Sequence, residues 1–354
     1  VASMHRYLVQ RFDVSDFLLE KQQAVSGGNE TPKKDAAGVP VNPTLDRLPF
    51  AINVAFQRYQ SRHDVSKACV LFVVQQGESN TVDQRLLEFK LFEEHKIPVV
   101  RLSLREIYEA VQLDETTGKL TISDTEIAVV YFRAGYAPTD YPDGDSGVEW
   151  QAREHLERSR ATKCPSLGYH LAGTKKVQQE LARKGVLERF VPSENAAMLR
   201  KSFAGLYSLG DDATHEDLEA VRDVLNGAQG RYVLKPQREG GGYNFYGDNM
   251  AAKIRKLVTI QDDNLTLDPK LGEFILMERL FPPHQKAILV RNGKIEGTGD
   301  TISELGCFGT IVVSGDGKIV HNEYAGFLLR TKFSNVDEGG VASGFATLSS
   351  PFLC

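Results

Sequence analysis

The sequence predicts an α/β protein in which a doubly wound parallel sheet precedes a region of mixed α+β type. Three observations indicate this class. Residues 68–74 form a continuous apolar run of the kind found in strands buried on both faces. Such runs alternate with amphipathic helical segments between residues 65 and 135. After residue 270, short apolar segments are joined by Asn-Gly and Asp-Gly turns, which indicate antiparallel hairpins.

The first 46 residues are expected to form a residual helix and a flexible linker. Residues 1–24 carry hydrophobic side chains at helical spacing, and residues 26–43 are rich in glycine, proline and charge. Because Val1 already lies within the expected helix, we expect the chain to be a fragment of something longer.

Residues 47–165 are expected to form the doubly wound α/β domain. The pattern predicts helices over 48–58, 83–95, 103–113 and 149–161, and strands over 68–74, 98–102 and 127–132. Ser103 is suited to cap the third helix together with Glu106. A hairpin turn is expected at Thr117-Gly118. Polar residues 75–81 and 133–136 follow two strand ends, where doubly wound sheets bind ligands.

Residues 166–354 are expected to form one α+β region that differs in type from the first sheet. Helices are predicted from Thr174 and over residues 214–227, each preceded by a capping residue. Apolar segments at 274–277, 287–290 and 310–313 are expected to form antiparallel hairpins, with turns at residues 292–293 and 316–317.

The bulk composition is that of an ordinary globular chain. The 354 residues are 41% hydrophobic and 25% charged, and the net charge of −5 argues against nucleic acid as the main partner. No apolar run approaches the roughly 18 residues that span a bilayer, so no membrane partner is expected. The four cysteines are widely separated, which favours a reducing, cytoplasmic location over a disulfide framework. The histidines lack the spacing of a zinc site.

The most informative segment is 231–246, where a short apolar strand runs into Lys235 and a glycine triplet. Without Cβ atoms, Gly240, Gly241 and Gly242 allow backbone N–H groups to approach an anion closely. Lys235 and Glu239 suit a nucleotide phosphate and its Mg²⁺ ion. Because the lysine precedes the glycines and no helix signal follows directly, a flexible lid fits better than the G-x-x-x-x-G-K-[ST] phosphate loop. A mobile surface turn is the alternative interpretation.

Further charged or hinge residues lie at the ends of predicted elements: Lys175, Lys235, Met277, Glu278, Glu304 and Lys332. Taken singly, a lysine or glutamate at the end of a strand is more often solvated than functional. If they converge with the glycine-rich segment, they would form a nucleotide site. Spacing alone therefore gives only moderate support for an ATP-using enzyme.

Longer motifs in the chain resemble those of eukaryotic glutathione synthetases, which are ATP-grasp ligases. The resemblance begins at residues 235–246 and 171–181. It recurs, in the order of the family, at residues 126–136, 203–208, 302–306, 328–332 and 339–342. It covers about residues 45–354. It implies an ATP-grasp fold, in which residues 47–165 are a substrate-binding domain and residues 166–354 include a glycine-rich lid.

The resemblance also implies a role for individual residues. The implied ATP-binding residues are Lys175, Lys235, Gln237, Gly240, Gly241, Gly242, Asn244, Tyr246, Met277, Glu278, Glu304, Lys332 and Glu338. The implied substrate-binding residues are Glu78, Ser79, Asn80, Gln84, Arg133, Ala134, Gly135, Tyr136, Val341 and Ala342. Arg330 is implied as the catalytic residue and Glu239 as the Mg²⁺ ligand.

The implied reaction joins γ-glutamylcysteine to glycine with ATP, through an acyl phosphate, in a cytoplasmic homodimer. Two departures from the family pattern lie in these motifs: Ala134 stands where an Asp is usual, and Glu338 where an Asp is common. The family also has more chain before this point, including a Glu-x-Asn strand that completes the Mg²⁺ site. We therefore expect this chain alone to be a poor or inactive ligase. The alternatives are a non-catalytic nucleotide-binding remnant and a related ligase with another acceptor amino acid.

Overall fold

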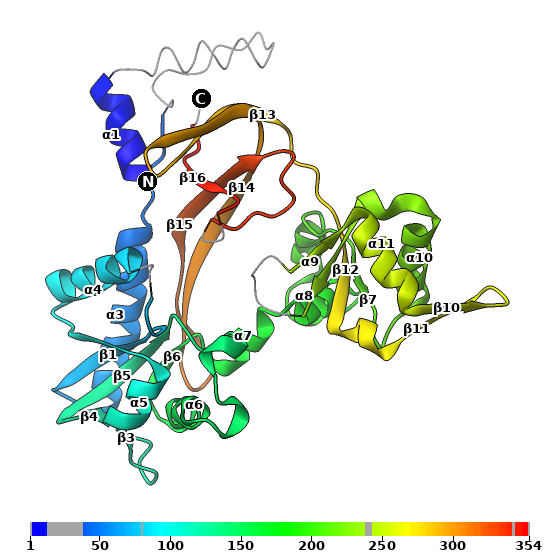
Figure 1. The fold of residues 1–354 in the computed structure, drawn as a ribbon. Coiled ribbons are helices and arrows are strands. Elements are labelled where there is room, and N and C mark those ends of the chain that lie inside the picture. The colour runs from blue at the N-terminus through cyan, green and yellow to red at the C-terminus, as the bar shows by residue number, and fades with distance from the viewer. Residues whose placement is uncertain (1, 13–37, 79–80, 238–242, 342–343, 353–354) are drawn as a thin grey trace. The chain divides into compact units, whose positions relative to one another are not determined.

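The computed structural model describes residues 2–12, 38–78, 81–237, 243–341 and 344–352. These residues group into two compact units (Figure 1). Unit 1 contains residues 1–164 and 284–354, and unit 2 contains residues 165–283. The expected domain limit near residue 165 lies at the start of unit 2. The strands after residue 283, which the sequence assigned to the second region, instead group with unit 1.

Unit 1 contains a mixed sheet of six strands in the order β2-β1-β5-β4-β3, with β6 also paired to β5. Its strands are β1 (Ala68–Val73), β2 (Val99–Leu102), β3 (Val111–Leu113), β4 (Leu120–Ile122), β5 (Thr125–Phe132) and β6 (Thr162–Cys164). The pairs β1–β2, β1–β5 and β5–β6 are parallel. The hairpin of β3 and β4 extends the sheet in antiparallel fashion from β5.

Helices cover both faces of this sheet. The helices of unit 1 include α1 (Ala2–Phe12), α3 (Thr44–His63), α4 (Val82–His95), α5 (Leu104–Ala110) and α6 (Val148–Arg158). Successive side chains of a strand point to opposite faces. Val70 and Phe72 accordingly pack into a core with α3 and α4, while Leu71 and Val73 pack into a second core with α5 and α6. The doubly wound layer is therefore confirmed.

Local sequence signals set several boundaries of this layer. Ser103 caps α5, because its hydroxyl accepts from the Glu106 N–H while the Glu106 carboxylate accepts from the Ser103 N–H, as expected. The prediction of a helix as far as residue 113 was wrong: α5 ends at Ala110 and the chain continues as β3. The turn at Gly118, which has φ +69°, joins β3 to β4 as expected.

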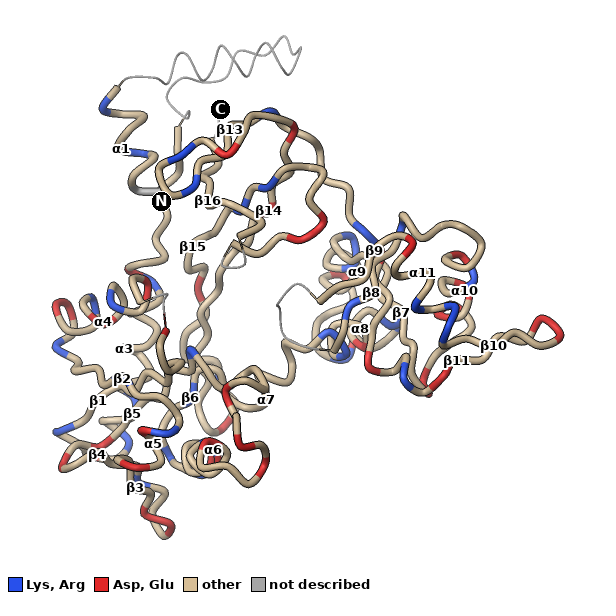
Figure 2. The backbone as a smooth tube through the Cα atoms, in the orientation of Figure 1, with Lys and Arg blue, Asp and Glu red and all other residues tan. Residues whose placement is uncertain are grey.

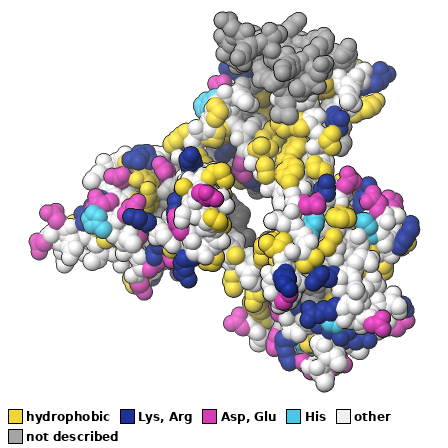
Figure 3. Space-filling view, turned by 180° about the vertical axis from the view of Figure 1, so that it is seen from behind, with side chains coloured by type: hydrophobic (Ala, Val, Ile, Leu, Met, Phe, Trp, Pro, Cys, Tyr) yellow, Lys and Arg dark blue, Asp and Glu magenta, His cyan; other side chains and the backbone are white. Residues whose placement is uncertain are grey.

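A second sheet in unit 1 is formed by residues after 284. Its strands, in order, are β13 (Gln285–Arg291), β14 (Lys294–Val313), β15 (Ile319–Phe333) and β16 (Thr347–Ser349). The hairpins at Asn292-Gly293 and Asp316-Gly317 are confirmed. The expected short strand at 310–313 is instead the end of the 20-residue β14, which pairs with β15 from Thr301 to Val313. Figure 3 shows hydrophobic side chains gathered on this part of the molecule, where Ile288 and Ile295 are exposed.

The middle of β15 is held against the segment before α3. The Asn42 side chain donates to the Phe327 carbonyl at 2.7 Å and accepts from the Phe327 N–H at 3.1 Å. Gly326 lies beside this contact with φ +105°, at the point where the β14–β15 register shifts. The Asn42 side-chain amide thus pairs with both the N–H and the carbonyl of Phe327, next to the register shift between β14 and β15.

Unit 2 is a smaller α+β layer. Its main sheet has the order β7-β12-β8-β9, and β10 and β11 form a separate hairpin. The strands are β7 (Leu206–Ser208), β8 (Tyr232–Pro236), β9 (Phe245–Tyr246), β10 (Val258–Gln261), β11 (Asn264–Leu267) and β12 (Phe274–Glu278). The helices include α7 (Leu167–Ala172), α8 (Lys175–Ala182), α9 (Ser193–Arg200), α10 (His215–Asp223) and α11 (Gly247–Lys256). A core forms between one face of the sheet and helices α10 and α11.

The sequence missed several elements of unit 2. Helices α7, α9 and α11 were not predicted, although α11 begins soon after the glycine-rich segment. Residues 274–277 do form a strand, but β12 pairs with β7 and β8 rather than with a hairpin neighbour. The expected linker at 26–43 lies mostly outside the described residues. Among the described residues, no helix combines the length and apolar content that a membrane crossing requires.

Candidate functional site

The carboxyl edge of the parallel strands in unit 1 brings several predicted substrate residues together. Arg133 follows β5, and its guanidinium donates to the Asp83 carboxylate at 2.6 Å. The buried amide of Gln84 donates to Glu78 at 3.3 Å. On the other side, its oxygen accepts from the Arg101 guanidinium at 2.6 Å. The predicted residues Glu78, Gln84 and Arg133 therefore lie at one edge of the sheet.

Two arginines at this edge retain unused hydrogen-bond donors. The Nε atoms of Arg101 and Arg133 are buried, and neither has a hydrogen-bond partner in the described part of the chain. Burial disfavours the charged form of Arg133, but nearby Tyr131 and Asp83 outweigh this effect and raise its pKa. Both guanidinium groups thus have donors left over, and a guanidinium suits a carboxylate ligand.

Sequence reasoning missed Arg101 and Asp83. Arg101 lies on β2 and Asp83 in the first turn of α4. The signal that could have found Arg101 is its position near the end of a parallel strand, where an apolar run is interrupted by one charged residue.

Three predicted ATP-binding residues share one face of the unit 2 sheet. Register places Lys235 opposite Ile275, and Val233 opposite both Met277 and Tyr246. Directly paired residues of antiparallel strands project to the same face. The alternate residues of β8 and β12 belong to the core with α10 and α11. Lys235, Met277 and Tyr246 therefore lie on the sheet face opposite that core.

Glu278 has a structural role that the sequence did not indicate. Its carboxylate accepts from the Gly205 N–H at 3.0 Å, and its own N–H donates to the Gly205 carbonyl at 2.8 Å. The next N–H, of Arg279, donates to the carbonyl of Arg231 at 2.8 Å. These contacts fasten the end of β12 to neighbouring segments, and an adenine contact by Glu278 stays a prediction.

Lys175 is the first residue of α8, and its neighbour Lys176 anchors that helix. Lys176 donates to the Asp212 carboxylate at 2.6 Å and to the Ser208 hydroxyl at 3.2 Å. Arg183, just after α8, donates to the same carboxylate at 2.7 Å. Asp212 thus holds the cations flanking α8 against the loop after β7, which positions Lys175 at the start of the helix.

The stability of this anchor is expected to depend on pH. Hydrogen bonds from Lys176 and then Ser208 hold the pKa of Asp212 far below its ordinary value of 3.8. Because the folded-state pKa is depressed, the stabilisation is fully present above that ordinary value and is lost as the pH falls through the folded pKa. Thermal melting from pH 7 to about pH 2, which enters the range where the contribution is lost, should therefore show a smaller acid-induced loss for Asp212→Asn than for the wild type. An equal loss in both proteins would contradict this assignment.

In unit 1, Glu304, Arg330 and Lys332 project from one face of the β14–β15 ladder. Glu304 is opposite Arg330 in the register and forms an ion pair with it. Lys332 is opposite Ile302, and its ammonium donates to the carbonyls of Asp337 at 2.6 Å and Glu338 at 3.1 Å. Lys332 thereby holds the turn that follows β15.

The loop near Val341 closes on itself. Its Val341 carbonyl accepts from the Gly344 N–H at 3.0 Å, and the Gly340 carbonyl accepts from Phe345 at 2.9 Å. Arg291 of β13 donates to the Gly344 carbonyl. Gly344 has φ +86°, a conformation that glycine adopts without strain. The backbone of Val341 is thus fixed by its own loop and by β13.

Several predicted site residues lie outside the described residues: Ser79, Asn80, Glu239, Gly240, Gly241, Gly242 and Ala342. Two predicted residues at the ends of the glycine-rich segment are described. The Gln237 N–H donates to the Glu273 carbonyl at 2.8 Å, and the Asn244 side-chain amide donates to the Tyr246 hydroxyl at 3.4 Å. In the described part of the chain, His, Cys, Asp and Glu side chains do not form a group of three that could hold a metal ion. Glu239 as the Mg²⁺ ligand stays a prediction.

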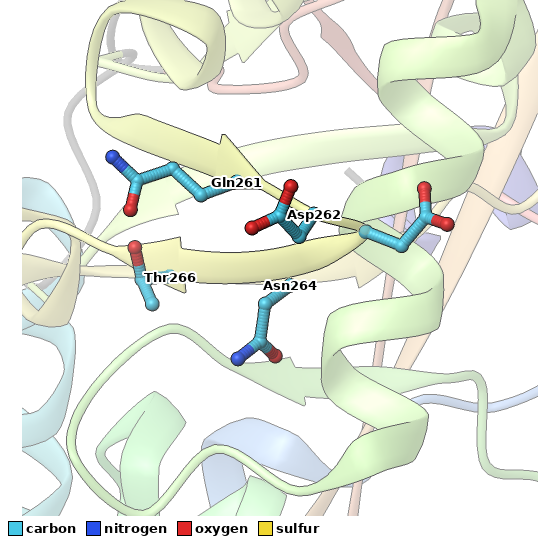
Figure 4. A pocket seen from close by; sticks show the side chains of 5 residues that line it. Gln261, Asp262, Asn264 and Thr266 are labelled. Carbon is cyan, nitrogen blue, oxygen red and sulfur yellow. The ribbon is translucent and has the colours of Figure 1, made fainter.

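A hollow at the tip of the β10–β11 hairpin is separate from the predicted site. It is lined by Gln261, Asp262, Asp263, Asn264 and Thr266. Figure 4 shows the labelled side chains pointing in different directions around the hairpin. Because their polar groups do not converge, the hollow offers no common binding point.

Acidic and basic residues are interspersed along both units (Figure 2).

Comparison with known proteins identifies a family. Residues 1–353 match the family model described as eukaryotic glutathione synthase, ATP binding domain. The chain is 40% identical over 354 residues to the chloroplastic glutathione synthetase of Solanum lycopersicum, with all of this chain covered. It is 38% identical over 359 residues to the glutathione synthetase of Dictyostelium discoideum, again with full coverage. It is 41% identical over 321 residues, or 90% of this chain, to that of Homo sapiens.

A solved structure shows the same fold at low sequence identity. The glutathione synthetase-like effector of Globodera pallida, in its apo form, aligns with a TM-score of 0.63 and 18% identity, covering 89% of this chain and 62% of that one. The chain spans only part of its relatives: 58% of the tomato protein, 68% of the Dictyostelium protein and 63% of the human protein.

Proposed function

The chain belongs to the eukaryotic glutathione synthase family, and from this premise we propose that it serves the ATP-dependent ligation of γ-glutamylcysteine to glycine. The observation that carries the proposal is the group of residues at the carboxyl edge of the unit 1 sheet. There, the half-buried side chains of Arg101 and Arg133 lie beside Gln84 and Glu78, and their buried Nε atoms have no hydrogen-bond partner among the described residues. A dipeptide with two carboxylates and one ammonium group matches the charges of these side chains.

Each unit carries residues that we propose for nucleotide binding. In unit 2, Lys235, Met277 and Tyr246 share a sheet face, which supplies a cation, an apolar side chain and an aromatic ring. In unit 1, Arg330 and Lys332 are two further cations on one face of the β14–β15 ladder. In each unit, such cations suit the negative charge of a nucleotide phosphate. Magnesium would be needed with ATP as co-substrate, and Glu239 is its proposed ligand.

The proposed chemistry has two steps. The cysteinyl carboxylate of γ-glutamylcysteine attacks the γ-phosphorus of ATP, so that ADP leaves and an acyl phosphate forms. The glycine amine then attacks the acyl carbon, phosphate leaves, and the amine loses a proton as the amide forms. Neither step needs a protein nucleophile, because phosphoryl transfer depends on positioning and charge neutralisation. The lysines and arginines named above would supply both.

A direct test is steady-state phosphate release with MgATP, γ-glutamylcysteine and glycine, together with detection of glutathione. Turnover that requires both γ-glutamylcysteine and glycine supports the proposal, even at the low rate expected of this chain alone. Tight ATP binding in calorimetry without any turnover would favour a nucleotide-binding remnant instead. Turnover with β-alanine or serine in place of glycine would indicate a related ligase with another acceptor.

Two adjacent lysines provide a matched pair for testing nucleotide binding. Lys175→Met is expected to raise the Kd for ATP about tenfold or more, because a charge-assisted contact to phosphate is lost. Lys176→Met is the control, since its ammonium is engaged by Asp212 and Ser208. That variant should melt at a lower temperature and change the Kd much less. Equal losses of ATP affinity in both variants, measured by calorimetry, would refute the assignment of Lys175.

We also propose a homodimer in the cytoplasm. The family resemblance supports the dimer, and the described cysteines, which are free, suit a reducing compartment. Light scattering on the purified chain tests the dimer, and a mass equal to one chain would contradict it. Imaging of a tagged protein tests the compartment, which matters because the tomato relative is named chloroplastic.

A further inference from the structure

The loop that follows β5 is held by a carboxylate that the family motifs did not single out. Asp140, in the short 3-10 turn Pro138–Asp140, accepts hydrogen bonds on one oxygen from three backbone N–H groups. The distances are 2.8 Å from Gly135, 3.1 Å from Tyr136 and 3.1 Å from Ala137. Three successive N–H groups that converge on one point form a concavity suited to an anion. Asp140 is an anion from the same chain that fills it.

The second oxygen of Asp140 extends this contact to a neighbouring strand end. It accepts from the side chain of Gln75 at 3.1 Å, and Gln75 lies in the segment after β1. One carboxylate therefore joins the segments after β1 and β5. These two segments carry Glu78 and Arg133, which are predicted to bind substrate.

The loop is also fastened through its carbonyl group. The Gly135 carbonyl accepts from the Tyr141 hydroxyl at 2.9 Å and from the Arg153 guanidinium at 3.1 Å. Arg153 is itself buried and lies over the Phe132 ring at 4.2 Å. Gly135 has φ +93°, and a Cβ there would meet both partners at 3.2–3.3 Å. The backbone of the loop is thus fixed on the donor side by Asp140 and on the acceptor side by α6.

The buried Ala134 explains why the anchor must come from elsewhere. Its methyl side chain is 2% exposed and has no polar atom to hold the loop. Because Asp140 already occupies the backbone N–H groups of residues 135–137, a ligand carboxylate cannot use them. Recognition of an anionic substrate at this edge then falls to side chains, above all to Arg133.

We propose that Asp140 is a positioning residue for γ-glutamylcysteine: it fills the anion-binding concavity of loop 135–137 and so fixes the loop from which Arg133 reaches the substrate. This inference rests on the proposed function for the identity of the ligand. The anchoring of loop 135–137 by Asp140 does not depend on the identity of the ligand, so the anchor and the ligand can be tested separately.

The binding experiment uses the full chain and calorimetry. Asp140→Ala is expected to raise the Kd for γ-glutamylcysteine about tenfold or more, because charge-assisted hydrogen bonds are lost, while the Kd for ATP stays unchanged. Sulfate should compete with γ-glutamylcysteine in this variant but not in the wild type, because the emptied N–H groups become available to an anion. Asp140→Asn, which keeps one acceptor oxygen, should lie between the two. The matched control is Asp145→Asn, at an exposed carboxylate in the neighbouring turn Gly144–Ser146.

Hydrogen exchange of the loop amides provides the second arm. The amides of Gly135, Tyr136 and Ala137 should exchange slowly in the wild type and in Asp145→Asn, and fast in Asp140→Ala. Equal exchange in all three proteins overturns the positioning role. A wild-type protein that does not bind γ-glutamylcysteine at all, while Asp140→Ala loses the protection of the loop amides, overturns the proposed substrate and leaves the loop anchor standing. A folded Asp140→Ala with wild-type affinity for γ-glutamylcysteine overturns the inference itself.

Discussion

Replacing Arg330 by alanine is expected to lower kcat for the ligation by about 10²- to 10³-fold, with little change in the KM for ATP. Arg330 is the predicted catalytic residue, and its guanidinium is held opposite Glu304 across the β14–β15 ladder. A cation held in place before the reaction stabilises charge that develops in the transition state more than charge already present on bound ATP. Loss of the group should therefore appear in kcat.

A lysine at the same position distinguishes charge from geometry. Arg330→Lys keeps one positive charge but loses the planar fork that pairs with two oxygens at once. We expect it to recover only part of the lost activity in single-turnover measurements of ADP formation.

The control is Arg47→Ala. Arg47 is another exposed arginine, and it is paired with Glu323, which like Arg330 lies on β15. That variant should keep wild-type kcat. Wild-type turnover in Arg330→Ala, or a loss confined to the KM for ATP, would refute the catalytic assignment.

Replacing Gly326 by alanine is expected to destabilise unit 1 by about 4 kcal/mol, which is exceptional for the addition of one methyl group. An ideal Cβ at this position would lie 2.0 Å from the Thr44 hydroxyl and 2.3 Å from the Asn42 side-chain oxygen. The backbone has φ +105°, a region that residues with a side chain rarely adopt. Relief of the clash would break the contacts between Asn42 and the Phe327 backbone.

Urea denaturation followed by circular dichroism measures this effect. The matched control is Gly168→Ala in α7, where the glycine is exposed and a Cβ would meet no atom within 4 Å. That substitution should be neutral or stabilising by up to ~1 kcal/mol, because alanine favours helix. Equal unfolding midpoints for Gly326→Ala and the wild type would contradict the packing described for β15.

The local signals in the sequence were sufficient where neighbouring residues decide the conformation. The apolar run at β1 predicted a strand buried on both faces, and its side chains do enter two cores. Ser103 and Glu106 predicted a capping box three residues apart, and the structure contains it. The Asn292-Gly293 turn predicted a hairpin, and both residues have positive φ. In each case the interacting groups are close in sequence, so pattern and propensity carry the information.

The positions of predicted site residues were partly accessible from the same patterns. Glu78 and Arg133 were expected at strand ends, and their common edge follows from the parallel pairing of β1 and β5. Lys235 and Met277 were chosen separately, and the antiparallel register of β8 and β12 places them on one face. The sequence could not show this register, because it depends on segments about 40 residues apart.

By itself, the sequence determined the α/β class, the family resemblance and the candidate site residues, because these follow from periodicity and from motifs read along the chain. The tertiary structure decided the grouping of residues 284–354 with the first unit and the long pairing of β14 with β15 from Thr301 to Val313. It also decided the partners of Arg101 and the anchoring of loop 135–137 by Asp140. These outcomes depend on contacts between distant segments and on the direction of individual side chains. The local order of residues does not specify these contacts or side-chain directions, because both form only when the segments pack together.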